Sequence, residues 1–466
     1  MFKFHKMIVR LKELELEKFR CFNSKATIKF EKLTIITGAN SSGKSSILHA
    51  IAGLSQSSEM PVKFSLNGKY TNMGDFNEIS NKHNPSNLIT IATKFNSQDI
   101  DYSLKTVWKR DNTNYLPELN ELDFSAPFFR LHIKDKLLNF NYNPDLDPLA
   151  TEESRKDFFE RSIASFNMNN NTKKIPAEKR AKELVKFKKF LTEFYKKTYV
   201  RNLKLSSLSN ADTVRAEISK KMNFRLDYFS NALLSKLIED FDYRFNLISS
   251  FRLYPNRTYL EASRDKSKVD KFGDGYLDQI MIWEKTNNPK LKELEKHLKE
   301  IGILTSLSSK RIGGGRYELQ LKINDKGVLS ALADVGFGVS QFLPIMVADL
   351  QLPKGSTLMI AEPEIHLHPN IQAKFGDYIV EQVEKKDKNY IIETHSEYFL
   401  NRLRLAIVKE ELQEKNLCVY YLENDGQDVK IHNLVFTKNG AIKNAPKSFF
   451  ETYMTDLKKI ALEVKI

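Results

Sequence analysis

The sequence has few cysteines and no long apolar run, and both absences exclude whole classes of protein. Cys21 and Cys418 are the only cysteines among 466 residues, too few for a disulfide framework or a cysteine-based metal site. The longest apolar stretches, such as 342–347, are far shorter than the roughly 18 residues that a membrane helix needs. Charges interrupt the first twenty positions, so a secretory signal is not indicated. We expect a cytoplasmic protein that does not act at a membrane.

What the chain does have is length, apolar content and positive charge. Its 41% hydrophobic residues predict large cores in more than one lobe. Lys and Arg (73) outnumber Asp and Glu (59), which gives a net charge of +14. Twelve basic and three acidic residues fall within 171–205, a segment that carries apolar residues at helical spacing: Leu184, Phe187, Leu191 and Phe194. This pattern predicts an amphipathic helix that packs on a protein partner or a core, with DNA as the alternative.

The order of strand and helix patterns predicts the fold class. Apolar strands alternate with helical patterns in two separate regions, 11–55 and 317–422, which favours one α/β unit with a mixed, largely parallel sheet. A mainly helical insertion is expected between them, and the Gly/Ser-rich stretch 306–315 is expected to be a returning loop. The domains predicted are an N-terminal head part, a helical insertion, a C-terminal head part and a small tail, over 1–100, 101–245, 246–436 and 437–466.

One motif predicts a phosphate-binding loop. The segment GANSSGKSS (38–46) matches G-x-x-x-x-G-K-[ST], with an apolar strand before it and a helix after it. Glycines let successive backbone N–H groups point inward, and the helix N-terminus adds its dipole to the same anion site. Lys44 supplies a positive charge to the phosphates, and the Ser45 hydroxyl is a Mg²⁺ ligand. We expect nucleotide contacts from Gly38, Ala39, Asn40, Ser41, Ser42, Gly43, Lys44, Ser45 and Ser46.

Two later strands end in groups that can act on a phosphate. The strand within 356–361 is followed by Glu362 and Glu364, and the strand 390–393 is followed by His395. Ligands of open α/β sheets gather at the carboxyl ends of the strands, so these side chains are candidate catalytic or Mg²⁺-holding groups. His366 and His368 lack a third ligand in register, so we expect them to shape the turn rather than bind a metal.

A second glycine turn opens into an apolar helix at 334–344. Its exposed backbone N–H groups and Ser340 form another anion-binding helix N-terminus. One nucleotide does not need two such sites. The simplest interpretation is that this one faces the nucleotide of a second subunit.

At these residues the chain resembles the ABC-type ATPase heads of the RecF/SMC/OLD group, and especially the OLD-like AAA ATPases of bacterial anti-phage defence. The four motifs similar to that group are GANSSGKSS (38–46, Walker A), VGFGVSQFLP (335–344, signature), LMIAEPEIHLHP (358–369, Walker B) and IIETHSEYFLNRLR (391–404, His switch). The segment SSFRLYPNRTYL (249–260) is similar to an Arg-containing segment of the group, and 437–453 resembles the domain of unknown function that follows such heads. The insertion is not covered.

The resemblance implies an ATP-driven dimer with ATP and Mg²⁺ as cofactors. Glu362 would be the catalytic Glu and His395 the switch histidine, acting with Lys44. Asn40 would reach the γ-phosphate, and Arg20 would lie near the adenine. The residues expected to contact the γ-phosphate from the other subunit are Phe337, Gly338, Ser340 and Gln341.

One departure concerns the metal. The position before the catalytic Glu normally holds an acidic Walker B residue, but here it is Ala361, whose methyl group accepts no hydrogen bond. We expect Ser45, Glu362 and Glu364 to form the Mg²⁺ site, and hydrolysis to be retained but slow.

Two functions are compatible with these motifs. The first, implied by the resemblance, is a sensor or scaffold ATPase that controls a separate effector, a nuclease or toxin encoded by an adjacent gene. The tail offers Asp425 and Asp428 but no Asp-x-Asp metal group of a nuclease. The second is a RecF-like DNA-maintenance ATPase that clamps DNA.

Overall fold

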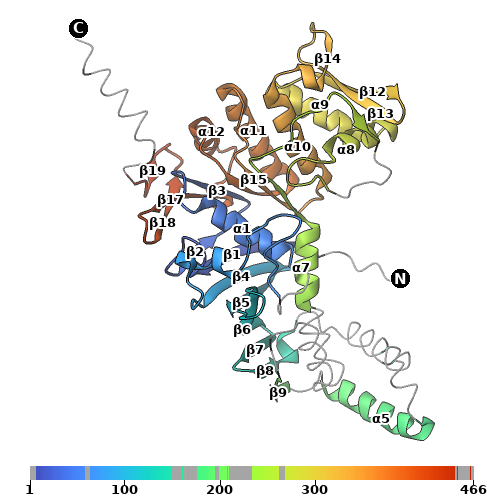
Figure 1. The fold of residues 1–466 in the computed structure, drawn as a ribbon, viewed down its shortest axis with the longest axis vertical. Coiled ribbons are helices and arrows are strands. Elements are labelled where there is room, and N and C mark those ends of the chain that lie inside the picture. Colours follow the sequence, from blue (N-terminus) through green and yellow to red (C-terminus); the bar gives the residue numbers. More distant parts are fainter. Residues whose placement is uncertain are drawn as a thin grey trace.

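The computed structural model describes most of the chain (Figure 1). The described residues are 7–57, 63–147, 160, 163, 176–194, 199–206, 208, 233–261, 268–446, 449 and 462. Within these ranges, every helix is too short or too polar to cross a membrane.

The central element is a sheet whose first five strands are parallel. In spatial order they are β10 (Phe245–Ile248), β15 (Thr357–Ala361), β16 (Asn389–Glu393), β3 (Leu33–Gly38) and β17 (Leu417–Asn424). The antiparallel strands β18 (Val429–Phe436) and β19 (Ile442–Lys443) extend one edge. All residues of β3, β15 and β16 are buried, as expected for strands covered on both faces. The predicted α/β fold with a mixed, largely parallel sheet is confirmed.

Helices cover both faces of this sheet. Helix α1 (Lys44–Ser55) packs on the face that carries Ile36 and Met359. The opposite face carries Ile35 and Ile360, and three helices cover it: α10 (Phe337–Gln351), α11 (Pro369–Lys386) and α12 (Glu397–Val408). Because successive side chains of a strand alternate between faces, the two cores share the same strands.

The insertion is a β-meander in its first half. Strands β1 (Val9–Glu17), β2 (Ala26–Lys29) and β4 (Ile89–Ser97) continue into the antiparallel series β5 (Ile100–Arg110), β6 (Pro117–Ala126), β7 (Phe129–Lys134), β8 (Leu137–Tyr142) and β9 (Tyr199–Lys204). Helical structure between 101 and 245 is confined to the later part, in α5 (Ala177–Phe194) and α7 (Leu233–Tyr243), within the described residues. The period-two burial of β7 shows why this first half forms strands.

A small antiparallel sheet lies beside the head, at the top of Figure 1. It consists of β11 (Tyr259–Leu260), β12 (Ser306–Gly313), β13 (Arg316–Lys322) and β14 (Leu329–Ala331), and it packs on α8 (Tyr276–Lys285) and α9 (Pro289–Ile301). The loop predicted over 306–315 is therefore wrong. Residues 306–313 pair with β13 and Leu307 is buried, so only Gly314 and Gly315, both with positive φ, form the turn. Short helical turns occupy Phe76–Ile79, Asn81–His83, Pro144–Leu146, Leu332–Asp334 and Glu414–Asn416.

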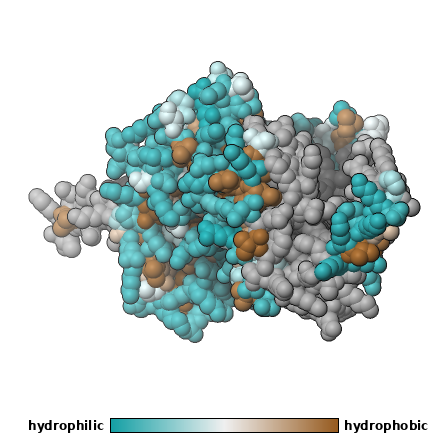
Figure 2. All heavy atoms as spheres, turned by 90° about the horizontal axis from the view of Figure 1, so that it is seen from below, coloured by the Kyte–Doolittle hydropathy of each residue, from teal (hydrophilic) through white to brown (hydrophobic). Residues whose placement is uncertain are grey.

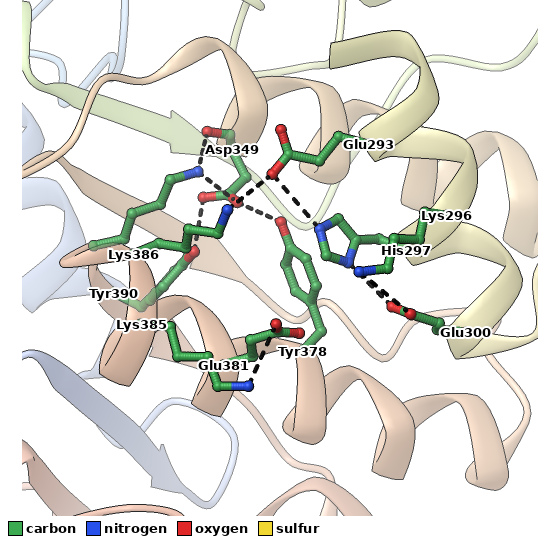
Figure 3. Close-up of polar contacts among 11 residues, drawn as sticks. Glu293, Lys296, His297, Glu300, Asp349, Tyr378, Glu381, Lys385, Lys386 and Tyr390 are labelled. Carbon is green, nitrogen blue, oxygen red and sulfur yellow. Dashed lines mark hydrogen bonds and ion pairs between the residues drawn. The ribbon is translucent and has the colours of Figure 1, made fainter. Parts of the chain in front are cut away.

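A buried polar network holds α10 against α11 and β16 (Figure 3). The carboxylate of Asp349 on α10, 1% exposed, accepts hydrogen bonds from the hydroxyls of Tyr378 and Tyr390. Lys388 Nζ lies 2.8 Å from Asp349 Oδ2 and completes a buried ion pair. Burial raises the pKa of both tyrosines well above 10. Asp349 therefore fixes the position of α10 relative to the parallel sheet.

The described surface is mostly hydrophilic on the face shown in Figure 2, where apolar side chains lie in small separate patches. The predicted helix in the basic segment is confirmed as α5, with exposed lysines at 179, 182, 186, 188 and 189. Leu184 is half-buried. The packing of Phe187, Leu191 and Phe194 lies outside the described side chains, as does most of the tail beyond 446.

Candidate active site

The loop between β3 and α1 has the backbone of a phosphate-binding loop. Gly38 has φ +144°, and a Cβ there would lie 2.3 Å from the Leu422 carbonyl oxygen. Gly43 is the N-cap of α1 in the left-handed conformation, with φ 102°. Only glycine meets both demands without strain. Between them Ala39, Asn40 and Ser41 form an exposed tip shortly before the N-terminus of α1, and phosphate binding by this loop stays a prediction.

Lys44 lies over this loop. Its Nζ donates to the carbonyl oxygens of Ala39 (2.8 Å) and Gly38 (3.2 Å), and the side chain is buried. Burial lowers the pKa of Lys44, while three nearby glutamates, Glu393 first, act in the opposite direction. A lysine held in this way can exchange its carbonyl contacts for phosphate oxygens without leaving the loop.

Ser45 and Ser46 follow on the first turn of α1. Ser45 is exposed, and its hydroxyl lies 3.2 Å and 3.5 Å from the two carboxylate oxygens of Glu393 at the end of β16. Ser46 is buried and contacts Cys21 Sγ. Sequence reasoning missed Glu393, although it directly precedes the Thr-His pair of the switch motif. Because Glu393 and Ser45 are 348 residues apart, their contact could not be predicted without the strand register.

Glu362 and His395 approach each other at the ends of neighbouring strands. Glu362 has φ 47° and its N–H donates to the Glu393 carbonyl oxygen at 2.7 Å, so the chain turns sharply after Ala361. The Glu362 carboxylate is 3.8 Å from His395 Nε2. Burial and Lys44 lower the pKa of His395, so its ring is neutral near pH 7 and can accept a hydrogen bond.

Glu364 has a different environment. Its carboxylate accepts a hydrogen bond of 2.6 Å from the His395 backbone N–H, and burial raises its pKa. The other carboxylate oxygen is buried without a partner among the described residues. The hydrogen bond links Glu364 to the loop after β16, and the Mg²⁺ contact expected of Glu364 stays a prediction.

Arg252 connects the catalytic turn to the signature helix. It is 2% exposed and donates to the carbonyl oxygens of Ala361 (2.8 Å), Glu362 (2.9 Å) and Gln341 (3.3 Å). Burial lowers its pKa to about 10, so the side chain stays charged at neutral pH. Sequence reasoning noted the segment 249–260 but not this residue, because its partners are backbone atoms.

The signature helix α10 begins at Phe337 after an exposed Gly336. Gly338 packs so tightly that a Cβ would lie 2.4 Å from the His366 carbonyl oxygen. Ser340 and Gln341 are buried, and their side chains donate within the subunit, to the carbonyl oxygens of Phe337 (2.8 Å) and Leu253 (3.2 Å). At this helix start Gly336 is exposed, residues 337–339 are half-buried, and the Gln341 side chain is directed inward.

Exposed apolar side chains surround this helix start. Phe251, Leu253 and Tyr254 are 70%, 51% and 75% exposed. Tyr254 stacks on Phe337, with ring centroids 4.5 Å apart, and His366 makes an edge contact with Phe337 at 4.7 Å. Exposed aromatic side chains in one place mark an interaction surface. We call Phe251, Leu253 and Tyr254 the aromatic patch.

Arg20 lies close to the nucleotide loop. Its guanidinium contacts His49 of α1, and the neighbouring Cys21 packs against Gly43. Burial lowers the pKa of Arg20 and, together with Arg20 and Lys271, lowers that of His49 to about 4. Arg20 thus lies beside α1, close to the loop, and its expected contact with adenine stays a prediction.

The two histidines after β15 shape the turn, in agreement with the expectation. His366 has φ 63° and packs on Phe337, and His368 is the N-cap of α11, accepting from Asn370 N–H. Among the described residues, one other group combines possible metal ligands: His297, Glu300 and Glu381 (Figure 3). Lys296 and Lys385 already pair with the carboxylates of Glu300 and Glu381, so we interpret this group as surface ion pairs.

The donors and acceptors at the loop fit a nucleoside triphosphate with Mg²⁺. The Ser42 hydroxyl is buried without a partner, the first N–H groups of α1 have no intrahelical acceptor, and Ser45 faces a carboxylate. Fold and site together define a P-loop nucleotide-binding protein of the α/β class.

Comparison with known proteins identifies the family. A family model described as an AAA ATPase domain matches residues 10–400, so the chain belongs to this ATPase family. No curated protein matches the sequence.

Solved structures give a likeness at low identity. The Smc head domain from Pyrococcus furiosus, bound to the C-terminal domain of ScpA, is 13% identical, with 97% of this chain and 100% of that chain covered and a TM-score of 0.41. The SMC head domain from Thermotoga maritima is 10% identical, with coverages of 91% and 98% and a TM-score of 0.35. At these values the likeness carries no information on function.

Proposed function

We propose that the protein hydrolyses ATP at sites formed between two copies of the chain. The observation that carries this proposal is the division of the phosphate-binding parts. Lys44, Ser45, Glu362 and His395 gather around one loop, whereas the exposed start of α10 has no acidic or basic catalytic side chain of its own. The aromatic patch beside α10 supplies apolar area for a second copy.

Each group at the loop has a role in this proposal. The backbone of 38–46 and Lys44 bind the phosphates, Asn40 reaches the γ-phosphate, and Arg20 supports the nucleotide side of α1. Mg²⁺, held by Ser45 and a carboxylate of the site, would neutralise phosphate charge. Glu362 accepts the proton of the attacking water, and His395 orients that water or the γ-phosphate. From the second copy, Phe337, Gly338 and Ser340 present the α10 N-terminus, while Gln341 holds that turn in place.

Glu362→Gln tests the catalytic assignment. Removing a general base should lower ATP turnover by about 10²- to 10⁴-fold, because glutamine cannot take the proton. ATP binding should be retained, since Glu362 does not hold the phosphate loop. Phosphate release and equilibrium nucleotide binding measure the two effects.

The exposed Glu239 on α7 provides a matched control, and Glu239→Gln should leave both quantities unchanged. Unchanged turnover in Glu362→Gln would refute the assignment.

The biological role we propose is that of a sensor or scaffold subunit that controls a separate effector, a nuclease or toxin, in bacterial anti-phage defence. This rests on the similarity of four motifs to OLD-like ATPases. The exposed basic helix α5 and the β-meander offer surfaces for an effector away from the loop. Co-purification with the products of adjacent genes, with and without ATP, should yield an ATP-dependent complex. A chain that purifies only as an isolated dimer would count against the role.

DNA clamping is the second candidate, and the lysines of α5 favour it. Two of these lysines, Lys182 and Lys186, already pair with Glu178 and Glu183. A DNA clamp should lose affinity steeply between about 50 and 200 mM salt. If duplex DNA neither binds nor stimulates ATP turnover at low salt, this candidate is wrong.

A further inference from the structure

We propose that Glu393 at the end of β16 is the carboxylate that holds Mg²⁺ in this protein, in place of an acidic residue at the end of β15. The inference rests on the proposed ATPase function and names a residue of its metal site.

The strand register places Glu393 beside the vacant acidic position. Ala361 and Glu393 are direct partners in the parallel pairing of β15 and β16, and Glu393 also pairs with Ile36 of β3. Partners in register point to the same face of a sheet. That face is the one covered by α1, since Met359 and Ile391, two residues earlier on each strand, belong to the core beneath α1. A carboxylate moved by one strand therefore stays on the α1 side.

Contact with Ser45 shows that the moved carboxylate reaches the metal-binding hydroxyl. Both Glu393 carboxylate oxygens lie within 3.5 Å of Ser45 Oγ. Strand β16 is also the immediate neighbour of β3, whose end becomes the phosphate loop. An oxygen pair next to a serine hydroxyl at the first turn of α1 matches the hard oxygen ligands that Mg²⁺ takes, one or two carboxylates with substrate phosphates.

The charge balance of the site calls for a cation. Glu393 is 4% exposed, and the hydroxyl of Ser45 is neutral. Lys44 is near enough to stabilise the carboxylate, but its Nζ donates to the carbonyl oxygens of Gly38 and Ala39. A buried carboxylate is costly unless it is paired or binds a metal. Mg²⁺ beside Ser45 would supply that pairing.

The same geometry explains the alanine. An acidic side chain at 361 would stand directly opposite Glu393 on one face, and like charges in that position destabilise a sheet. The site accommodates one carboxylate, that of Glu393, and Ala361 places no second negative charge beside it.

The other glutamates of the site have different contacts, and one Glu364 carboxylate oxygen has no partner among the described residues. Glu364 accepts from the His395 backbone N–H, and Glu362 faces the His395 ring. Neither has a hydrogen bond to Ser45 among the described contacts.

Mn²⁺ binding, followed by electron paramagnetic resonance in the presence of ATP, tests the inference without turnover. In the Glu362→Gln background, which should not hydrolyse ATP, Glu393→Gln is expected to weaken Mn²⁺ binding by at least about tenfold, as loss of groups at metal sites does. ATP binding in EDTA should stay unchanged. The Glu239→Gln control should bind Mn²⁺ as the background does.

A rescue variant separates a metal ligand from a structural residue. Ala361→Asp combined with Glu393→Ala returns the carboxylate to β15 and should restore most of the Mn²⁺ affinity that Glu393→Ala loses. Glu393→Gln with undiminished Mn²⁺ binding, or a double variant no better than Glu393→Ala, would overturn the inference and leave the ATPase proposal standing. A background protein that binds no ATP at all would overturn both.

Discussion

The N-termini of α1 and α10, the two helix starts that we propose bind phosphate, are built in different ways. At α1, left-handed Gly43 is followed by Lys44 and Ser45, with Glu393, Glu362 and His395 close by. At α10, Gly336 is outermost, and the polar side chains of Ser340 and Gln341 are buried and bonded within the subunit. The first start carries charge and catalytic groups, while the second offers backbone N–H groups alone. This difference supports the proposal that α10 completes a site whose catalytic groups belong to another copy.

The largest effect is expected from Asp349→Ala, which removes the anchor of α10. It leaves Lys388 buried without its charge partner and two tyrosine hydroxyls without an acceptor, so unfolding free energy should fall by about 3–5 kcal/mol. Chemical denaturation measures this. Asp325→Ala removes an exposed aspartate of the small sheet and should have little effect. Equal stability of the two variants would contradict the anchoring role.

The second-largest effect is expected from Lys44→Ala, which should impair nucleotide binding at the α1 loop and leave α10 unchanged. Loss of charge-assisted hydrogen bonds to phosphate should weaken ATP binding by about 100-fold, which is about 2.7 kcal/mol. Fluorescent nucleotide binding measures it, with exposed Lys326→Ala as the matched control. ATP affinity within about twofold of wild type would show that the loop does not bind phosphate.

A smaller effect, on the α10 side, is expected from Tyr254→Ala. Truncating an exposed aromatic of the patch should weaken ATP-dependent dimerisation by about tenfold, because aromatic anchors contribute most at interfaces. ATP binding by the monomer should persist. Sedimentation with ATP measures the dimer, and exposed Tyr398→Ala on α12 is the control. Equal weakening of dimerisation in both variants would show that the aromatic patch has no specific role in it.

The sequence allowed a feature to be predicted where the residues of that feature lie close together in the chain. The phosphate loop lies in one continuous stretch, so its strand, glycines and helix could be located from spacing alone. Glu393 could not, because its role depends on which strand pairs with β15 and in which register. Arg252 could not be predicted because it binds backbone carbonyl oxygens, which every residue type has. The meander of 100–142 was not predicted because this segment was interpreted from its charge and not from its alternating apolar residues.

The same limit applies to side-chain direction. Gln341 lies in a recognisable motif, yet only packing against Leu253 shows that its amide turns inward. Glu364 was grouped with Glu362 because the two are only two residues apart, although their side chains have different partners.

Mixing two inactive variants tests the shared site most directly. Lys44→Ala disables the loop. Gly336→Glu places a carboxylate at the α10 start, where a Cβ meets open space and an acid is compatible with the helix dipole, so the chain should fold while repelling phosphate. Gly336→Gln controls for size.

If each site uses the loop of one copy and α10 of the other, random pairing should restore about a quarter of wild-type ATP turnover, because half of the dimers then carry one intact site. Turnover that stays at the level of the separate variants would contradict the account.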